Sequence, residues 1–230
     1  MTFLDQPLGA LACSIPGATQ VFHAHKLDFC CGGKHSLRVA AARRGLDAGR
    51  IADQLTQLQA ASPGDGRDWR DAPARDLIDH VLVRFHQRHR EQLPELIRLA
   101  RRVEQVHGDR PDCPRGLADH LTVMQQELES HMQKEEQVLF PALSQGYFPG
   151  IQGPVSVMRH EHDQHGEALR HLEALTADIT LPPGACNTWR ALYLGLATLR
   201  EDLMEHIHLE NNILFEGATA QPSDLEHSHG

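Results

Sequence analysis

A ten-residue pattern occurs twice in this chain and constrains its fold more than any other feature. The copies span residues 131–140 and 206–215, and both read His, three residues, Glu, two residues, a β-branched residue and then Leu-Phe. On a helix, residues four apart lie one turn apart on the same face. Each copy therefore presents a His and a Glu as a stripe along one helix, and two such stripes are what a two-metal site in a helical bundle needs.

A second pattern repeats at almost the same distance. Residues 86–93 and 162–169 both read His, two residues, His, one residue, Glu, one residue and Leu. The offset is 76 residues for this pattern (86 to 162) and 75 for the first one (131 to 206). Two independent patterns that share one offset indicate a duplicated pair of helices. Such a duplication closes into an up-down four-helix bundle with pseudo-twofold symmetry.

Composition and periodicity predict an all-α chain, with this bundle preceded by a small helical N-terminal domain. Aromatic residues make up only 5% of the sequence, and abundant Leu, Ala, Gln, Glu and Arg favour helix over sheet. Apolar residues at helical spacing predict bundle helices over residues 73–106, 116–144, 154–177 and 185–216. The predicted boundaries are 1–60 for the small domain with its cysteine pair, 61–72 for a linker, 73–217 for the bundle and 218–230 for a disordered tail.

Charge, hydropathy and cysteine number exclude several classes of protein. A formal charge of −9 argues against nucleic acid as a partner, because phosphate binding needs a basic face. No apolar stretch approaches the roughly 20 residues of a membrane span, and the start of the chain does not have the pattern of a signal peptide. Five cysteines, an odd number with two adjacent, are a poor disulfide framework and fit a reducing compartment. We therefore expect a cytoplasmic protein that binds no membrane.

The repeated His and Glu residues predict a metal centre in the core of the bundle. Short loops between antiparallel helices bring the ligands of neighbouring helices close together, so that all four helices deliver side chains to one level. Imidazole and carboxylate together suit iron, zinc or manganese. Two carboxylates that can each bridge, with two His per metal, suit a pair of metals, and carboxylate-bridged di-iron is the leading form. The candidate ligands are His86 or His89, His131, Glu135, His162 or His165, His206 and Glu210.

Other polar residues near these ligands have less distinctive positions. Glu127 and Asp202 lie one turn before the ligand His of each copy, where a carboxylate can orient an imidazole or lead protons and cations toward the metals. For Glu127 we hypothesise this role. Glu136 and Glu161 are next to ligands in the sequence and are expected to face another direction. His208 is expected at the surface.

The other unusual element is the sequence Cys30-Cys31-Gly32-Gly33. Adjacent cysteines rarely bond to each other, because the eight-membered ring is strained. Two thiolates beside flexible glycines can instead hold iron, react with nitric oxide derivatives or cycle with an external thiol. We therefore hypothesise that Cys30 and Cys31 transfer iron or a nitrosyl group. A pair of packed, inert cysteines is the alternative.

The order of the His and Glu residues resembles the hemerythrin-like fold. It departs from the oxygen-carrying hemerythrins, whose third helix carries His-x-x-x-His, because Gly166 stands four residues after His162. Their last helix ends in an aspartate, where this chain has Glu210. The N-terminal residues 28–33 (Asp-Phe-Cys-Cys-Gly-Gly) joined to such a bundle are similar to the repair-of-iron-centres proteins, the di-iron iron–sulfur cluster repair family. Stretches 5–9, 89–96 and 209–212 support this resemblance, which covers residues 2 to about 216.

That resemblance implies a ligand set and a function. Its two iron ions would be bridged by Glu135 and Glu210. The implied function is repair of iron–sulfur clusters damaged by nitric oxide or peroxide, by donation of iron. The alternatives are a di-iron enzyme that reduces nitric oxide or peroxide, and a sensor of oxygen or nitric oxide. The expected partners are proteins with damaged clusters, nitric oxide and a second copy of the chain. The implied ligands are His86, His131, Glu135, His162, His206 and Glu210.

Overall fold

The computed structural model describes residues 2–61, 69–145 and 150–219, and their regular structure is helical. The only β pairing in these residues is an isolated bridge between Pro7 and Ser36. The predicted all-α class is therefore confirmed. The predicted linker and tail lie largely outside the described residues. Within the described ranges, no helix is both long enough and apolar enough to cross a bilayer.

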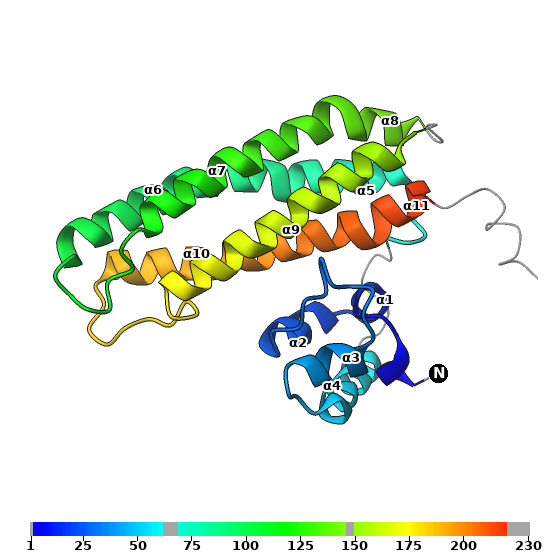
Figure 1. The fold of residues 1–230 in the computed structure, drawn as a ribbon, viewed down its shortest axis with the longest axis horizontal. Coiled ribbons are helices and arrows are strands. Elements are labelled where there is room, and N and C mark those ends of the chain that lie inside the picture. Colours follow the sequence, from blue (N-terminus) through cyan, green and yellow to red (C-terminus); the bar gives the residue numbers. More distant parts are fainter. Residues whose placement is uncertain (1, 62–68, 146–149, 220–230) are drawn as a thin grey trace, which may run out of the picture. The chain divides into compact units, whose positions relative to one another are not determined.

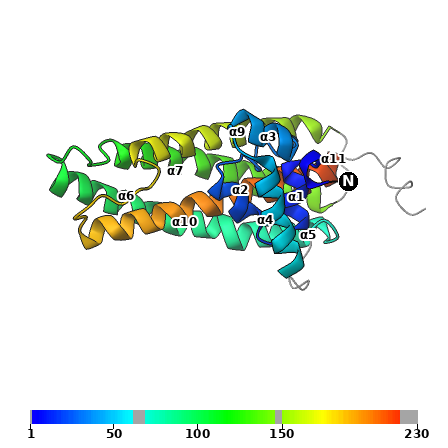
Figure 2. The ribbon, with the colours of Figure 1, turned by 90° about the horizontal axis from the view of Figure 1, so that it is seen from below.

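The chain forms two compact units, one of residues 79–204 and one of residues 1–78 with 205–230. The first unit contains four long helices that lie side by side and alternate in direction (Figures 1 and 2). The domain boundaries expected from the sequence stay a prediction. The long helices are α6 (Gln87–His107), α7 (Leu117–Lys134), α9 (Gln152–Leu175) and α10 (Asn187–Leu209), the last of which belongs to this unit up to Met204.

Apolar residues at helical spacing bury the inner faces of these helices. Each fully buried Leu stabilises the fold by roughly 1.5–3 kcal/mol relative to an exposed one. Gly116 precedes α7 with a φ of 86°, a left-handed conformation that glycine adopts without strain. On α10 the buried side chains recur every three or four residues, at Trp189, Leu192, Leu196, Leu199 and Leu203.

Three of the four predicted bundle helices contain a π-helical turn, which widens the helix by one residue. The third predicted helix, α9, is α-helical throughout. Pro94 lies inside α6 and does not end it. The turns are η2 (Leu82–His86), η3 (Glu135–Leu139) and η4 (Glu210–Leu214). The short helices beside them are α5 (Ala74–Val81), α8 (Phe140–Ser144) and α11 (Phe215–Thr219).

The second unit combines the N-terminal residues with the segment that begins at Glu205. Its N-terminal part begins with a short 3-10 turn, η1 (Phe3–Asp5), and Ser36 caps α3 by accepting the backbone N–H of Val39. The loop of residues 28–35 is held against the start of α1, where Leu8 and Gly9 donate their N–H groups to the loop at 2.9 Å. The helices are α1 (Leu8–Ser14), α2 (Ala18–Ala24), α3 (Leu37–Arg43) and α4 (Ala48–Ala61).

Candidate metal centre

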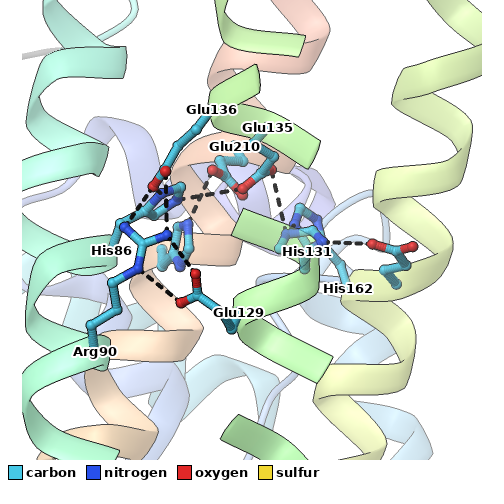
Figure 3. A network of polar contacts seen from close by, with 10 residues as sticks. His86, Arg90, Glu129, His131, Glu135, Glu136, His162 and Glu210 are labelled. Atoms are coloured by element: carbon cyan, nitrogen blue, oxygen red, sulfur yellow. Dashed lines mark hydrogen bonds and ion pairs between the residues drawn. The ribbon is translucent and has the colours of Figure 1, made fainter. Parts of the chain in front are cut away.

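Four of the predicted ligands converge inside the bundle unit. His86 Nε2 lies 3.4 Å from Glu135 Oε2, and His131 Nε2 lies 3.4 Å from Glu135 Oε1. His162 Nε2 lies 3.1 Å from His131 Nε2. All four side chains are buried, and Figure 3 shows them pointing toward one another from three helices. Carboxylate and imidazole groups that are buried this close together need a compensating charge.

The other two predicted ligands lie one turn apart at the end of α10. His206 Nε2 is 3.0 Å from Glu210 Oε1, and both side chains are buried. Glu210 is the first residue of η4, just as Glu135 is the first residue of η3. The repeat found in the sequence is therefore repeated in the helix geometry, because each copy begins a π-helical turn at its Glu.

The six side chains form two groups in which one ligand atom per residue lies within 4.8 Å of the others. Glu135 and Glu210 belong to both groups, as expected of carboxylates that bridge two metals. The groups are His86, Glu135, His206 and Glu210, and His131, Glu135, His162 and Glu210.

The distances between these side chains suit ligands that share a metal ion. Two ligand atoms about 2.1 Å from one ion are about 3.0 Å apart at a right angle and about 3.4 Å apart at a tetrahedral angle. The contacts between these ligand atoms span 3.0 to 3.4 Å. They join His131 to His162, His206 to Glu210, and Glu135 to both His86 and His131. The donor set is nitrogen and oxygen, which suits iron, manganese or zinc. The residues present therefore fit a metal centre.

Two carboxylates outside this set orient ligand imidazoles. His86 donates Nδ1–H to Glu136 Oε1 at 2.8 Å, and His131 donates Nδ1–H to Glu161 Oε2 at 2.9 Å. Such bonds fix the tautomer that turns Nε2 toward the metal. Burial raises the pKa of Glu136, but Arg90 and His86 outweigh it and the net shift is downward. The pKa of Glu161 is lowered in the same way, with Lys134 and His131 outweighing burial.

Arg90 connects Glu136 to a second carboxylate at the rim of the centre. Its guanidinium donates to both oxygens of Glu136, at 2.8 and 3.2 Å, and to both oxygens of Glu129, at 2.8 and 3.1 Å (Figure 3). The bonds to Glu129 and then to Glu136 raise the pKa of Arg90. Arg90 therefore keeps Glu136 ionised and holds it against His86.

Glu136 and Glu161 face another direction from the ligands next to them, as expected, but each contacts a ligand on the neighbouring helix, which sequence spacing did not indicate. A residue next to a ligand points away from its own helix's stripe and toward the adjacent helix. Glu127, the hypothesised partner of His131, is exposed, and the carboxylate that accepts from His131 Nδ1 is Glu161.

Asp202, considered for a similar role beside His206, accepts a 2.6 Å bond from Arg84, and Arg88 lies 3.7 Å away. The sequence also left open which His of each His-x-x-His pair faces the centre. His86 and His162 belong to the ligand groups. His89 stacks on Phe85.

His208 was expected at the surface, but it is buried within the second unit, which combines residues 1–78 and 205–230. Its ring lies edge-on to Phe29 at 5.5 Å, and Asn212 Nδ2 donates to its Nδ1 at 3.0 Å. Burial lowers the pKa of His208 to about 4, so the imidazole is neutral. His208 lies two residues after His206 and so points away from the ligand stripe. The loop that contains Phe29 buries it, a contact that helical periodicity did not indicate.

The Cys30-Cys31 loop forms a separate, well-defined structure. Asp28 Oδ1 accepts the backbone N–H groups of Cys31 and Gly32 at 2.9 and 3.0 Å, and the thiol of Cys30 lies 3.4 Å away. The two sulfur atoms are 3.9 Å apart. The contact with Cys31, followed by burial, raises the pKa of the Cys30 thiol well above its usual range. Asp28, Cys30 and Cys31 form a third group of potential metal ligands.

The chain has sequence matches along nearly all of its length. The profile of the Hemerythrin HHE cation binding domain family matches residues 77–218, and that of a Domain of Unknown function (DUF542) matches residues 4–59. A protein of Citrobacter koseri named iron-sulfur cluster repair protein YtfE is 54% identical over 220 residues, which are 96% of this chain and 99% of that protein. Proteins of the same name from Pectobacterium atrosepticum and Escherichia coli are 53% identical, over 95% and 96% of this chain and 98% and 99% of theirs.

Proposed function

We propose that this chain, which belongs to the family of iron–sulfur cluster repair proteins with a Hemerythrin HHE cation binding domain, restores damaged clusters by donating iron. The observation that carries this proposal is the pair of ligand groups that share Glu135 and Glu210. The proposed content is two iron ions, bridged by these two carboxylates. Each ion would also take two imidazoles, from His86 and His206 or from His131 and His162.

The chemistry of the donor set supports donation. Bound ferrous iron is the cargo, and it leaves for the thiolates and sulfides of a damaged cluster, which are softer ligands and hold iron more tightly than oxygen and nitrogen do. Glu136 and Glu161 hold the protons of His86 and His131 at Nδ1, so that Nε2 stays available as a ligand. The six buried ligands exclude bulk water from the centre.

The thiol pair gives the chain a second site of thiolate character. Cys30 and Cys31 would accept iron or a nitrosyl group in transit, with the Asp28 carboxylate as the third ligand. All five cysteines of the chain are present as thiols, which suits the proposed location in the cytoplasm. The proposed partners are proteins that carry damaged iron–sulfur clusters, together with nitric oxide. A homodimer is a further proposal.

Reduction of nitric oxide is the second candidate function, favoured by the same pair of ligand groups. In that case the centre would turn over substrate with electrons from a separate reductase and would keep its iron. The sensor interpretation has less support, because the N-terminal residues 2–61 form four short helices rather than an output domain. The three interpretations differ in whether the iron leaves the protein and in whether nitric oxide is consumed.

The first experiment measures metal content by elemental analysis after anaerobic purification. We expect about two iron ions per chain, and none in a Glu135→Ala, Glu210→Ala double variant. Glu201→Ala, which removes an exposed carboxylate of α10, is the matched control and should keep the iron. One zinc ion, or iron that survives the double variant, would contradict the proposal.

A second experiment separates donation from turnover. Iron-loaded protein is mixed under anaerobic conditions with an iron–sulfur protein whose cluster has been damaged by nitric oxide. Donation predicts that the loaded protein loses iron while the cluster recovers. Catalytic consumption of nitric oxide without loss of iron would favour the second function instead.

A further inference from the structure

Two asparagines hold the Cys30-Cys31 loop against the segment that carries Glu210. Asn211 Nδ2 donates to the backbone oxygen of Cys30 at 3.2 Å. Asn212 Nδ2 lies within donating distance of the backbone oxygens of Phe29, at 3.2 Å, and of Cys30, at 3.3 Å. Both asparagines follow Glu210 directly in η4. We call Asn211 and Asn212 the asparagine latch.

The Asn212 amide is enclosed by glycines on the opposite side. A Cβ atom on Gly9 would lie 2.6 Å from Asn212 Oδ1, and a Cβ atom on Gly33 would lie 2.5 Å from the same oxygen. A side chain at either position would therefore displace the Asn212 amide. Asn212 is also fixed to its own helix, where its Nδ2 lies 3.0 Å from His208 Nδ1. The amide is therefore built into the loop and is not a surface contact.

We propose that the asparagine latch positions the thiol pair, holding it closed while metal occupies the centre and releasing it when metal leaves. This inference rests on the proposed function. Glu210, Asn211 and Asn212 are consecutive residues of one π-helical turn, so a metal ion that fixes the Glu210 carboxylate also restricts the two amides. Binding that couples two sites acts equally in both directions.

The asparagine latch implies that the metal centre and the Cys30-Cys31 pair act one after the other. In the closed loop, Cys30 is 5% exposed and Cys31 is partly exposed. Once the centre has donated its iron, the loop opens and the thiols take up the next ferrous ion. Uptake is a ligand exchange in which each thiol releases one proton and its thiolate replaces one water of the hydrated ferrous ion, and no electron is transferred.

The test measures how fast iodoacetamide alkylates Cys31, by peptide mass spectrometry, in metal-free and Mn²⁺-loaded protein, because Mn²⁺ prefers oxygen and nitrogen ligands to thiolates. Asn212→Ala removes the donor that faces the Phe29 and Cys30 carbonyls, and we expect alkylation to accelerate about tenfold or more; Asn211→Ala removes the donor to the Cys30 carbonyl, and we expect about fivefold. Cys186, an exposed thiol in the other unit, is the internal reference. Asn187→Ala, an exposed asparagine at the start of α10, is the matched control.

A double-variant cycle tests the latch without depending on one substitution. The atoms within 3 Å of a Cβ on Gly9 both belong to the Asn212 side chain, so Gly9→Ala should speed alkylation alone but add nothing to Asn212→Ala. A Cβ on Gly33 also meets the backbone oxygen of Phe29 at 2.7 Å. Gly33→Ala should therefore remain disruptive in the Asn212→Ala background.

Mn²⁺ should slow alkylation of Cys31 in the unaltered chain and have little effect in Asn212→Ala. The proposal is overturned if folded Asn212→Ala is alkylated at the original rate, or if Mn²⁺ protects both proteins equally. It is also overturned if the effects of Gly9→Ala and Asn212→Ala simply multiply. Failure of iron donation would leave these rates unchanged, so the two proposals fail separately.

Discussion

The contact between Glu136 and His86 gives the sharpest test of the metal centre, because the carboxylate acts on the metal only through the imidazole. Glu136→Ala removes the acceptor of His86 Nδ1–H at 2.8 Å and leaves the six ligands in place. Removing such a partner lowers metal affinity about 10- to 100-fold, or about 1.4–2.8 kcal/mol. Glu136→Gln keeps an oxygen acceptor without charge, and a neutral bond has about half the strength. We therefore expect about a 3- to 10-fold loss for Glu136→Gln.

Glu129→Gln is the matched control, because Glu129 shares Arg90 with Glu136, whereas the acceptor of His86 Nδ1–H is Glu136. We expect less than about a threefold change for this variant, the value of an exposed ion pair. The assay is competition for Fe²⁺ with a chromogenic chelator, under anaerobic conditions and at one pH, since protons compete with metal. The argument is refuted if Glu129→Gln weakens binding as much as Glu136→Ala, or if Glu136→Ala binds as tightly as the original chain.

Three further predictions concern the thiols, the core and the carboxylate at the end of the bundle unit. Because the pKa of Cys30 is raised, its thiolate fraction at pH 8 is below that of an ordinary thiol, so Cys30 should be alkylated only at higher pH than a small free thiol; an equal pH profile by mass spectrometry would contradict this. Leu196→Ala should cost about 2–5 kcal/mol in urea unfolding, whereas Leu194→Ala, at a side chain 73% exposed, should change stability by less than about 0.5 kcal/mol. Asp202→Ala should destabilise the fold by about 1–3 kcal/mol and leave Fe²⁺ affinity unchanged, since its carboxylate pairs with Arg84 and Arg88; a tenfold loss of affinity would instead restore the role first considered for it.

Periodicity predicted the helices and the paired candidate positions on the second and fourth of them, whereas the choice of His86 and His162 as ligands came from the family resemblance. The shared offset of 75 or 76 residues placed His131, Glu135, His206 and Glu210 in equivalent positions, and the structure brings their side chains into common groups. The π-helical turns were not predicted. A π turn adds one residue to the helix and rotates the segment that follows it. Because each flanking segment keeps its own helical spacing, the amino-acid composition of the turn does not reveal it. Val138, part of the repeated pattern, is 62% exposed and does not join the core.

The residues that orient the ligands were harder to find, for a geometric reason. Sequence spacing describes one helix, whereas His86 and Glu136 lie 50 positions apart on two helices. Their contact depends on the rotation of each helix about its axis, and η2 and η3 alter that rotation. The burial of His208 likewise depends on the loop that contains Phe29, about 180 residues earlier in the chain.

The duplication also explains why one chain has both a metal centre and a latch. Glu136 and Asn211 are equivalent positions, each one residue after the Glu of its copy (136 + 75 = 211). In the first copy the side chain accepts from His86, and in the second it donates to the Cys30 carbonyl. Exchanging their chemistry tests this division. Asn211→Glu would place a carboxylate against a carbonyl oxygen, so we expect Cys31 alkylation at least as fast as in Asn211→Ala, with Fe²⁺ affinity within about threefold of the original. If Asn211→Glu keeps the loop closed, or if it changes metal binding as strongly as Glu136→Ala does, then the two copies have not divided these roles.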